Sequence, residues 1–140
     1  MSLIKIIFDR FHYPHQSYHK TNEQKRKGVS DEEIFSRLEK AVIKKKLYLK
    51  HEVNIKELAS EVGTNRTYIS RALKSKEFSF SRYINSFRIQ YAIEVMGKDE
   101  NKALSIAEIA EKCGFSSDRA MNHYLRKAVG VTASVFRKRL

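Results

Sequence analysis

Ile55-Lys-Glu-Leu-Ala-Ser-Glu-Val-Gly63 is repeated 51 residues later as Ile106-Ala-Glu-Ile-Ala-Glu-Lys-Cys-Gly114. Isoleucine, glutamate, an aliphatic residue, alanine, a small apolar residue and glycine occupy the same places in both copies. Each copy continues into a second stretch with helical spacing, so the two units cover about residues 54–76 and 105–128. A helix, a glycine turn and a second helix form the outline of a helix-turn-helix. The repeat therefore predicts two such units in one chain.

Three capping boxes predict where helices begin. In this pattern the N-cap side chain accepts a hydrogen bond from the backbone N–H three residues later. The glutamate at that later position accepts in turn from the backbone N–H of the N-cap residue. The pattern occurs at Ser30-Asp-Glu-Glu33, Asn54-Ile-Lys-Glu57 and Ser105-Ile-Ala-Glu108. The helix that starts at Ser30 is expected to run to Leu49, with an apolar face made of Ile34, Phe35, Leu38, Val42 and Leu49.

The remaining segments also have helical patterns. Between the two units, residues 80–96 carry apolar side chains at largely helical spacing and form the predicted connecting helix. Thr132 can cap a short last helix from Ala133 to Arg139. Pro14 is the only proline, and no alternating apolar runs bounded by turn residues are present. The sequence therefore predicts an all-α fold.

Composition favours a polyanionic partner. The 140 residues carry a formal charge of +12, distributed as +5 over residues 1–52, +3 over 53–96 and +4 over 97–140. Because the excess is spread over the chain, nucleic acid is favoured over a membrane surface. Cys113 is the only cysteine, so no intrachain disulfide can form and a reducing, cytoplasmic location is expected. No secretory signal or membrane span is predicted.

The second helix of each unit has one apolar and one polar face. The inward stripes are predicted to be Tyr68, Ile69, Ala72 and Leu73, and then Ala120, Met121, Tyr124 and Leu125. The outward faces are Arg66, Thr67, Ser70, Arg71 and Lys74, and then Asp118, Arg119, Asn122, His123 and Arg126. These residue types can bind base edges and phosphates. A solvated polar face is the alternative, but two such faces in tandem on a basic chain favour nucleic acid.

Residues 53–139 resemble the AraC/XylS family of bacterial transcription regulators. The most specific match is Ile106 to Ser116, and further matches are Tyr68 to Lys74, Phe80 to Asn85, Arg88 to Ala92 and Gly130 to Thr132. The resemblance implies about seven helices, arranged as two homeodomain-like helix-turn-helix subdomains joined by a long connecting helix. Their recognition helices would enter adjacent major-groove segments about 34 Å apart. It also implies activation of transcription, usually by contact with RNA polymerase.

The resemblance also carries over candidate DNA contacts. The base-contact candidates are Arg66, Thr67, Ser70 and Arg71 in the first unit and Asp118, Arg119, Asn122 and His123 in the second. The phosphate candidates are Lys74 and Arg126, one turn later, and the capped helix starts at Asn54, Asn65 and Ser105. Arg71 is the strongest single candidate, because a guanidinium can donate two hydrogen bonds to guanine O6 and N7.

The chain departs from the family pattern at four places. The glycine usual between the first recognition helix and the connecting helix is missing from residues 74–80, a segment one residue shorter than usual. Met121 replaces the usual aromatic residue and can fill the same core space. His123 replaces the usual arginine, and a neutral imidazole offers one donor at most, so the second unit is expected to read DNA weakly. Ala133 replaces the usual proline at the start of the last helix.

Domain organisation follows from these segments. Residues 1–29 are predicted to be an N-terminal linker or extension, and residues 30–140 the DNA-binding domain. An effector-binding barrel does not fit into the 52 residues before the first unit, so the three alternatives are a sensor in a missing N-terminal part, a sensor in a partner, and no sensor at all. The linker could join the domain to such a sensor, for example in a membrane-bound regulator. No cofactor and no small-molecule site are predicted.

Two other functional classes and one other site were weighed. A helical protein-interaction module would expose apolar residues on the outward faces, whereas a non-specific architectural DNA binder would lack sequence discrimination by Arg71. His12, His15 and His19 cluster in the linker but lack a cysteine or carboxylate at ligand spacing, so no metal site is predicted. Paired carboxylates, a nucleophile motif and a glycine-rich phosphate loop are all missing, so the chain is not predicted to be an enzyme.

Overall fold

The computed structural model describes residues 29–140, so all but the last residue of the predicted linker, including its histidines, lies outside the described residues. Within the described part, the chain forms seven α-helices and two short 3₁₀ helices, with no strand. The all-α prediction and the expected number of helices are therefore confirmed.

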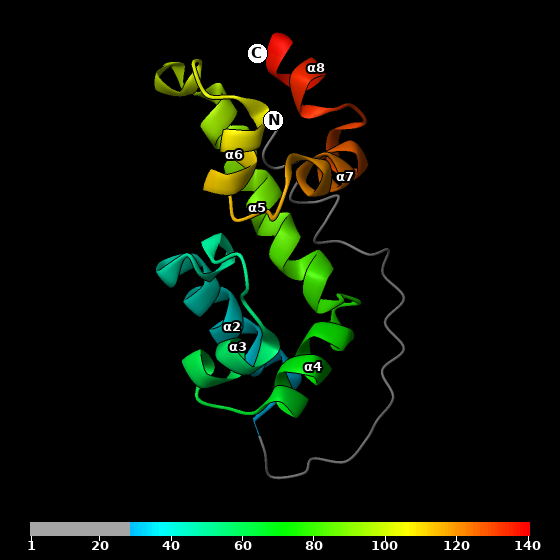
Figure 1. Cartoon of the computed structure of the whole chain (residues 1–140). Coiled ribbons are helices and arrows are strands. Elements are labelled where there is room, and N and C mark those ends of the chain that lie inside the picture. Colours follow the sequence, from blue (N-terminus) through cyan, green and yellow to red (C-terminus); the bar gives the residue numbers. More distant parts are fainter. Residues whose placement is uncertain (1–28) are drawn as a thin grey trace.

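The helices form two lobes on either side of one long helix (Figure 1). The first lobe contains α2 (Asp31–Lys45), η1 (Leu47–Leu49), α3 (Ile55–Val62) and α4 (Arg66–Ser75). The second lobe contains η2 (Asp99–Asn101), α6 (Ile106–Lys112), α7 (Asp118–Val129) and α8 (Ala133–Lys138). The connecting helix α5 (Phe80–Gly97) runs between them and packs against elements of both lobes.

Side-chain caps fix the starts of the helices, as the three capping patterns predict. Ser30 accepts from the Glu33 N–H at 3.1 Å and Asn54 accepts from the Glu57 N–H at 2.9 Å. At Ser105 both halves of the capping box form, because the Glu108 side chain also accepts from the Ser105 N–H at 2.7 Å. Each cap satisfies one of the amides that a helix start leaves without an intrahelical partner.

The predicted extension of the first helix to Leu49 is wrong. α2 ends at Lys45, and Lys46 takes the left-handed conformation at φ 49°. Lysines 44–46 are all exposed, so this turn of the chain has nothing to bury. The turn at Lys46 brings Leu47, rather than Leu49, into the core. Ile34, Leu38 and Val42 are buried as predicted, and Phe35 is half-buried.

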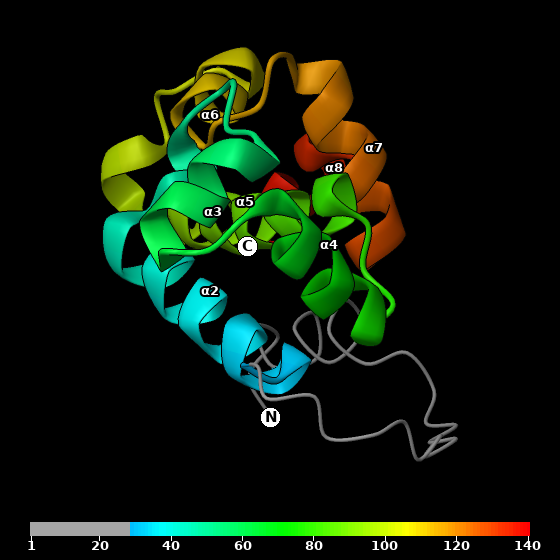
Figure 2. The same cartoon turned by 90° about the horizontal axis from the view of Figure 1, so that it is seen from below.

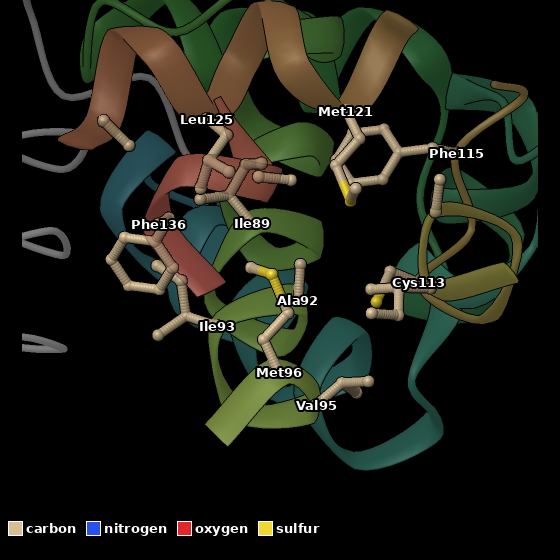
Figure 3. Packing of buried hydrophobic residues seen from close by; sticks show 14 residues of the cluster. Ile89, Ala92, Ile93, Val95, Met96, Cys113, Phe115, Met121, Leu125 and Phe136 are labelled. Atoms are coloured by element: carbon tan, nitrogen blue, oxygen red, sulfur yellow. The ribbon is translucent and has the colours of Figure 1, made fainter. Parts of the chain in front are cut away.

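The two lobes have separate hydrophobic cores that share α5. In the first lobe Tyr83 and Phe87 of α5 pack with Phe35 and Phe78 in an aromatic cluster. In the second lobe (Figure 3), the α5 side chains Ile89, Ala92, Ile93, Val95 and Met96 pack with Phe115, Met121, Leu125 and Phe136. Met121 is fully buried, so a methionine fills the place of the family's aromatic residue, as predicted.

The turn after α4, where the resemblance leads one to expect a glycine, has Glu77 at positive φ. Its φ is +59°, in the left-handed region. The Glu77 N–H donates to the Lys74 carbonyl at 2.9 Å, and the Phe78 N–H donates to the Leu73 carbonyl at 2.9 Å. These two bonds, with Phe78 buried beneath them, form a Schellman motif. The helix end is therefore kept without glycine, at the cost of a strained backbone conformation at Glu77.

None of the helices described is both long enough and apolar enough to cross a membrane.

Replacing Glu77 by glycine should stabilise the protein. We expect Glu77→Gly to raise the free energy of unfolding by up to about 1 kcal/mol, because glycine adopts positive φ without strain but adds freedom to the unfolded chain. Lys40→Gly, at an exposed position inside α2, is the control and should lower it by about 1 kcal/mol. Urea unfolding measures both, and a loss of stability in Glu77→Gly would contradict the strain argument.

The Cys113 thiol should be inert in the folded protein. Cys113 is fully buried, and this burial raises the pKa of its thiol to about 12 from 9.0, with Lys112 acting in the opposite direction. The raised pKa stabilises the folded protein fully below about pH 9, and this contribution is lost as the pH rises towards 12. At pH 8 we expect a disulfide reagent to modify Cys113 at least about 100-fold more slowly than the exposed cysteine in Ser116→Cys. Equal rates would show that the turn opens readily.

Candidate nucleic-acid interface

The second helices of the two units, α4 and α7, lie on the same side of the molecule in both views (Figures 1 and 2). Each follows a glycine with positive φ, Gly63 at +78° and Gly114 at +89°. Each also begins with a side-chain cap, because Asn65 accepts from the Tyr68 N–H and Ser117 from the Ala120 N–H, both at 3.1 Å. The repeat in the sequence is therefore a repeat in structure.

The outward face of α4 brings the first set of candidates together. Ile69, Ala72 and Leu73 are buried and Tyr68 is half-buried. The side chains on the opposite face are exposed along the whole helix: Arg66, Thr67, Ser70, Arg71 and Lys74. This face is cationic and carries hydroxyl groups, so it can donate hydrogen bonds to an anionic or acceptor-rich partner.

Arg71 makes only weak contacts within the protein. Its side chain is 62% exposed, and its Nε lies 3.8 Å from an Asp31 carboxylate oxygen at the start of α2. The guanidinium carbon lies 5.9 Å from the centre of the Tyr68 ring. Exposed ion pairs of this length contribute little to stability. The Arg71 guanidinium is therefore held near Tyr68 but remains available to a ligand.

The outward face of α7 surrounds a shallow hollow of about 530 Å³. The residues that line it are Asp118, Arg119, Asn122, His123, Arg126 and Lys127. All of these except Asn122 are exposed, whereas Met121 and Leu125 on the other face are buried. The His123 ring meets Tyr124 edge-on, with ring centres 5.0 Å apart. Lys127 also belongs to this face but is not among the predicted residues, although it follows His123 by four residues and so lies on the same side of the helix.

Asn122 lies on the outward face, as predicted, but also has a structural contact. Its side chain is half-buried, and its Oδ1 accepts from the Ala133 N–H at 2.8 Å. Ala133 stands where the family usually has proline, which has no N–H to donate. Asn122 therefore ties α7 to the start of α8, and only its amide group remains free to donate to a ligand.

The helix-start candidates differ in what they can offer. The Asn54 and Asn65 side chains each cap their own helix and leave the first amides of α3 and α4 without intrahelical partners. Ser105 is different, because its own N–H donates to Glu108. The first amides of α6, beyond Ser105, also lack intrahelical partners, so the helix start at Ser105 remains a phosphate candidate. Lys74 and Arg126 are exposed at the far end of the two outward faces.

A helix-turn-helix domain family matches residues 58–139, which is more than half of the chain. This chain belongs to the AraC/XylS-type helix-turn-helix family. The resemblance drawn from the two repeats and the Ile106 to Ser116 segment is thereby confirmed.

Two curated relatives of this AraC/XylS-type chain are longer proteins. It is 31% identical over 80 residues to the TCP pilus virulence regulatory protein of Vibrio cholerae. This match covers 57% of this chain and 28% of the relative. It is 29% identical over 89 residues to the Msm operon regulatory protein of Streptococcus mutans. That match covers 63% of this chain and 31% of the relative. The chain therefore spans less than a third of the length of these relatives.

Two solved structures share this arrangement of helices. ToxT from Vibrio cholerae matches with a TM-score of 0.62 and 26% identity, over 74% of this chain and 38% of ToxT. A DNA-binding transcriptional dual regulator from Escherichia coli K-12 matches with a TM-score of 0.65 and 21% identity, over 76% of this chain and 97% of the regulator. At that identity the second match shows a common fold and no more.

Removing the Asn122 side chain should destabilise the protein in the absence of any ligand. We expect Asn122→Ala to lower the free energy of unfolding by about 1 kcal/mol, because the Ala133 N–H loses its acceptor. Ser70→Ala, on the exposed face of α4, is the control and should change it by less than about 0.5 kcal/mol. Denaturant unfolding measures both changes. Equal small effects would mean that the bond from Ala133 does not hold α8 in place.

Proposed function

We infer that this protein is a sequence-specific regulator of transcription that binds double-stranded DNA through α4 and α7. The observation that carries this inference is the pair of exposed, cationic faces on the two matching helices of the repeat, on one side of the molecule. A major groove admits an α-helix, and two recognition helices on one chain would enter successive groove segments about 34 Å apart. Membership of the AraC/XylS type supports the same role.

α4 supplies the stronger reading surface in this proposal. Arg66, Thr67, Ser70 and Arg71 would contact bases, with Arg71 donating two hydrogen bonds to guanine O6 and N7. The long ion pair of Arg71 with Asp31 is exposed, so it opposes this contact only weakly. The hydroxyl groups of Thr67 and Ser70 can donate or accept and would bind either type of base edge.

α7 would read DNA more weakly than α4. Its base-contact candidates are Asp118, Arg119, Asn122 and His123. Asp118 accepts from the Arg119 N–H at 3.0 Å but retains acceptors that suit the amino group of cytosine. The Asn122 oxygen already accepts from the Ala133 N–H, which leaves it one lone pair and less freedom to turn for a bidentate contact with adenine. Arg119 is the strongest donor among the base-contact candidates of this helix.

Phosphate contacts would fix the protein on the duplex. Lys74 and Arg126, at the ends of the two faces, can each bind a phosphate oxygen. The first amides of α3 and α4, next to Asn54 and Asn65, can bind phosphate through the positive end of the helix dipole. The first amides of α6, next to Ser105, can do the same, although the Glu108 carboxylate that accepts from the Ser105 N–H adds a negative charge there. The formal charge of +12 favours such contacts over the whole chain.

The distribution of apolar side chains disfavours a protein-docking role for these faces. Among the residues described, the large apolar side chains that are exposed are Val29, Ile43, Val135 and Leu140. None of them lies on α4 or α7, whose outward faces are polar. A protein-interaction module built on the two recognition helices would need an apolar contact surface there.

We also propose the wider role on the basis of family membership. The protein would act in the bacterial cytoplasm and activate transcription by contact with RNA polymerase. A sensor outside the matched region, in this protein or in a partner, would control it.

Selection of bound sequences from a random pool of double-stranded DNA tests the function. We expect an enriched motif with two blocks one helical turn apart, the stronger block belonging to α4. Arg71→Ala should weaken binding by about 1–3 kcal/mol and relax the motif at one position of that block. Arg37→Ala, which removes an exposed arginine from α2, is the control for loss of charge.

A salt titration separates the specific from the non-specific binder. The selected DNA should bind more tightly than a scrambled duplex at every salt concentration, and Lys74→Ala should reduce the salt slope by about 1 on both DNAs. Equal affinity and equal slopes on the two DNAs would indicate a non-specific architectural binder. If the protein bound neither DNA, the result would favour the alternative function as a protein-interaction module.

A further inference from the structure

Arg88 lies in the middle of α5 and is buried, with 8% of its surface exposed. Its Nε donates to the Tyr48 carbonyl at 2.6 Å, and one terminal nitrogen donates to the Lys50 carbonyl at 2.7 Å. The other terminal nitrogen donates to the Asn85 side chain at 3.2 Å. Two of these acceptors belong to the segment around η1, so Arg88 ties the first lobe to the centre of the connecting helix.

The second lobe meets Arg88 from its other side. The centre of the guanidinium lies 5.9 Å from the centre of the Phe115 ring, in the turn between α6 and α7. A Cβ on the neighbouring Gly114 would lie 2.5 Å from the Tyr48 carbonyl oxygen, 3.0 Å from the Leu49 Cα and 3.1 Å from the Arg88 Nε. The backbone of the second-lobe turn is therefore packed directly on the backbone of the first lobe.

The equivalent glycine of the first unit has no such contact. A Cβ on Gly63, at the same place in the repeat, would meet no atom within 4 Å. Both glycines have positive φ, so both satisfy the same local turn. Only Gly114 has a second constraint, which comes from the other lobe. Aromatic contacts continue the junction, because the Tyr48 ring packs on Phe87 at 5.7 Å and on Tyr91 at 6.2 Å between ring centres.

We propose that Arg88, Gly114 and the Tyr48 backbone form an interlobe latch, which fixes α4 relative to α7 and so sets the spacing of the two DNA blocks. In this role Arg88 is a positioning residue and does not contact DNA. The consequence for DNA rests on the function proposed above, whereas the rigid junction does not.

A rigid junction between the lobes would make the affinity depend on the number of base pairs between the two DNA blocks. One inserted base pair moves the second block by about 3.4 Å and turns it by about 34° around the DNA axis. Two recognition helices held at a fixed distance and angle fit one spacing only. If the junction is loose, α7 can follow its block, and neighbouring spacings are bound almost equally well.

The junction is tested first without DNA, by measuring the distance between two spin labels. The labels are placed at Lys56→Cys and Ala107→Cys, which are exposed and hold equivalent positions in the two units. Cys113 is buried and should remain unlabelled. We expect one narrow distance distribution for the parent, and a broader or shifted one for Arg88→Lys and for Gly114→Ala. An ammonium cannot donate to the same pair of carbonyls in the planar geometry of a guanidinium.

Matched controls separate the latch from local strain. Gly63→Ala introduces the same methyl group at positive φ without an interlobe contact, and Arg82→Lys changes an exposed arginine of α5. Both should leave the distance distribution unchanged. If the distributions of Arg88→Lys and Gly114→Ala also match the parent, the latch is overturned. Arg88→Lys serves as the test by itself if Gly114→Ala does not fold.

The consequence is tested by binding to the selected DNA with one base pair added or removed between its blocks. The parent should lose at least about tenfold in affinity, similar to the loss of one base-pair contact. Arg88→Lys should lose less than about threefold on the same change while binding the isolated α4 block like the parent. If Arg88 had only a structural role, Arg88→Lys would weaken binding to DNA of every spacing alike. Binding is measured at temperatures at which thermal unfolding shows each variant to be folded.

The two arms distinguish the latch from the proposed function. Changed distances together with no selected DNA motif would support the latch and refute sequence-specific binding. A two-block motif whose spacing preference is the same in Arg88→Lys and in the parent would support the function and refute the role of the latch in spacing.

Discussion

The structure depends on a single helix that is buried on almost every side. Each lobe has only three other α-helices, and lobes of that size would be marginal without the share of core that α5 supplies. Burial also takes polar side chains inside, where an unpaired group lowers stability. Asn85 donates to the Ser81 carbonyl at 2.8 Å and Ser86 to the Tyr83 carbonyl at 2.6 Å. With 18 residues, α5 is a rod of about 27 Å that carries a recognition helix on each half.

The two units use one sequence pattern in different surroundings. In the first unit the glycine turn is open, and the outward face of α4 makes few contacts with the protein. In the second unit the turn is pressed against the first lobe, and Asn122 on α7 binds the start of α8. One candidate on the outward face of α7, Asn122, is therefore held by another helix, whereas on α4 the contact is the long, exposed ion pair of Arg71 with Asp31.

Most of the fold could be predicted from the sequence because its signals are local. A cap joins a side chain to an amide three residues away, and an apolar stripe repeats with the period of the helix. These two rules predict the helix starts at Ser30, Asn54 and Ser105, the connecting helix and the polar faces of α4 and α7. They fail where a local rule competes with a distant contact. Glu77 is strained at the end of α4, and Leu47 replaces Leu49 in the core after the turn at Lys46.

The sequence by itself determined the all-α class, the two units, the family and which residues could face a ligand. The tertiary structure alone decided how the parts are joined. Arg88 reaches carbonyls 40 and 38 residues earlier in the chain, and Arg137 of α8 donates to the carbonyl of Leu104, 33 residues earlier. A backbone carbonyl has no residue type, so no pattern in the sequence marks it as the acceptor for a distant guanidinium. Such contacts exist only once the helices have packed, and those of Arg88 join the two lobes that carry α4 and α7.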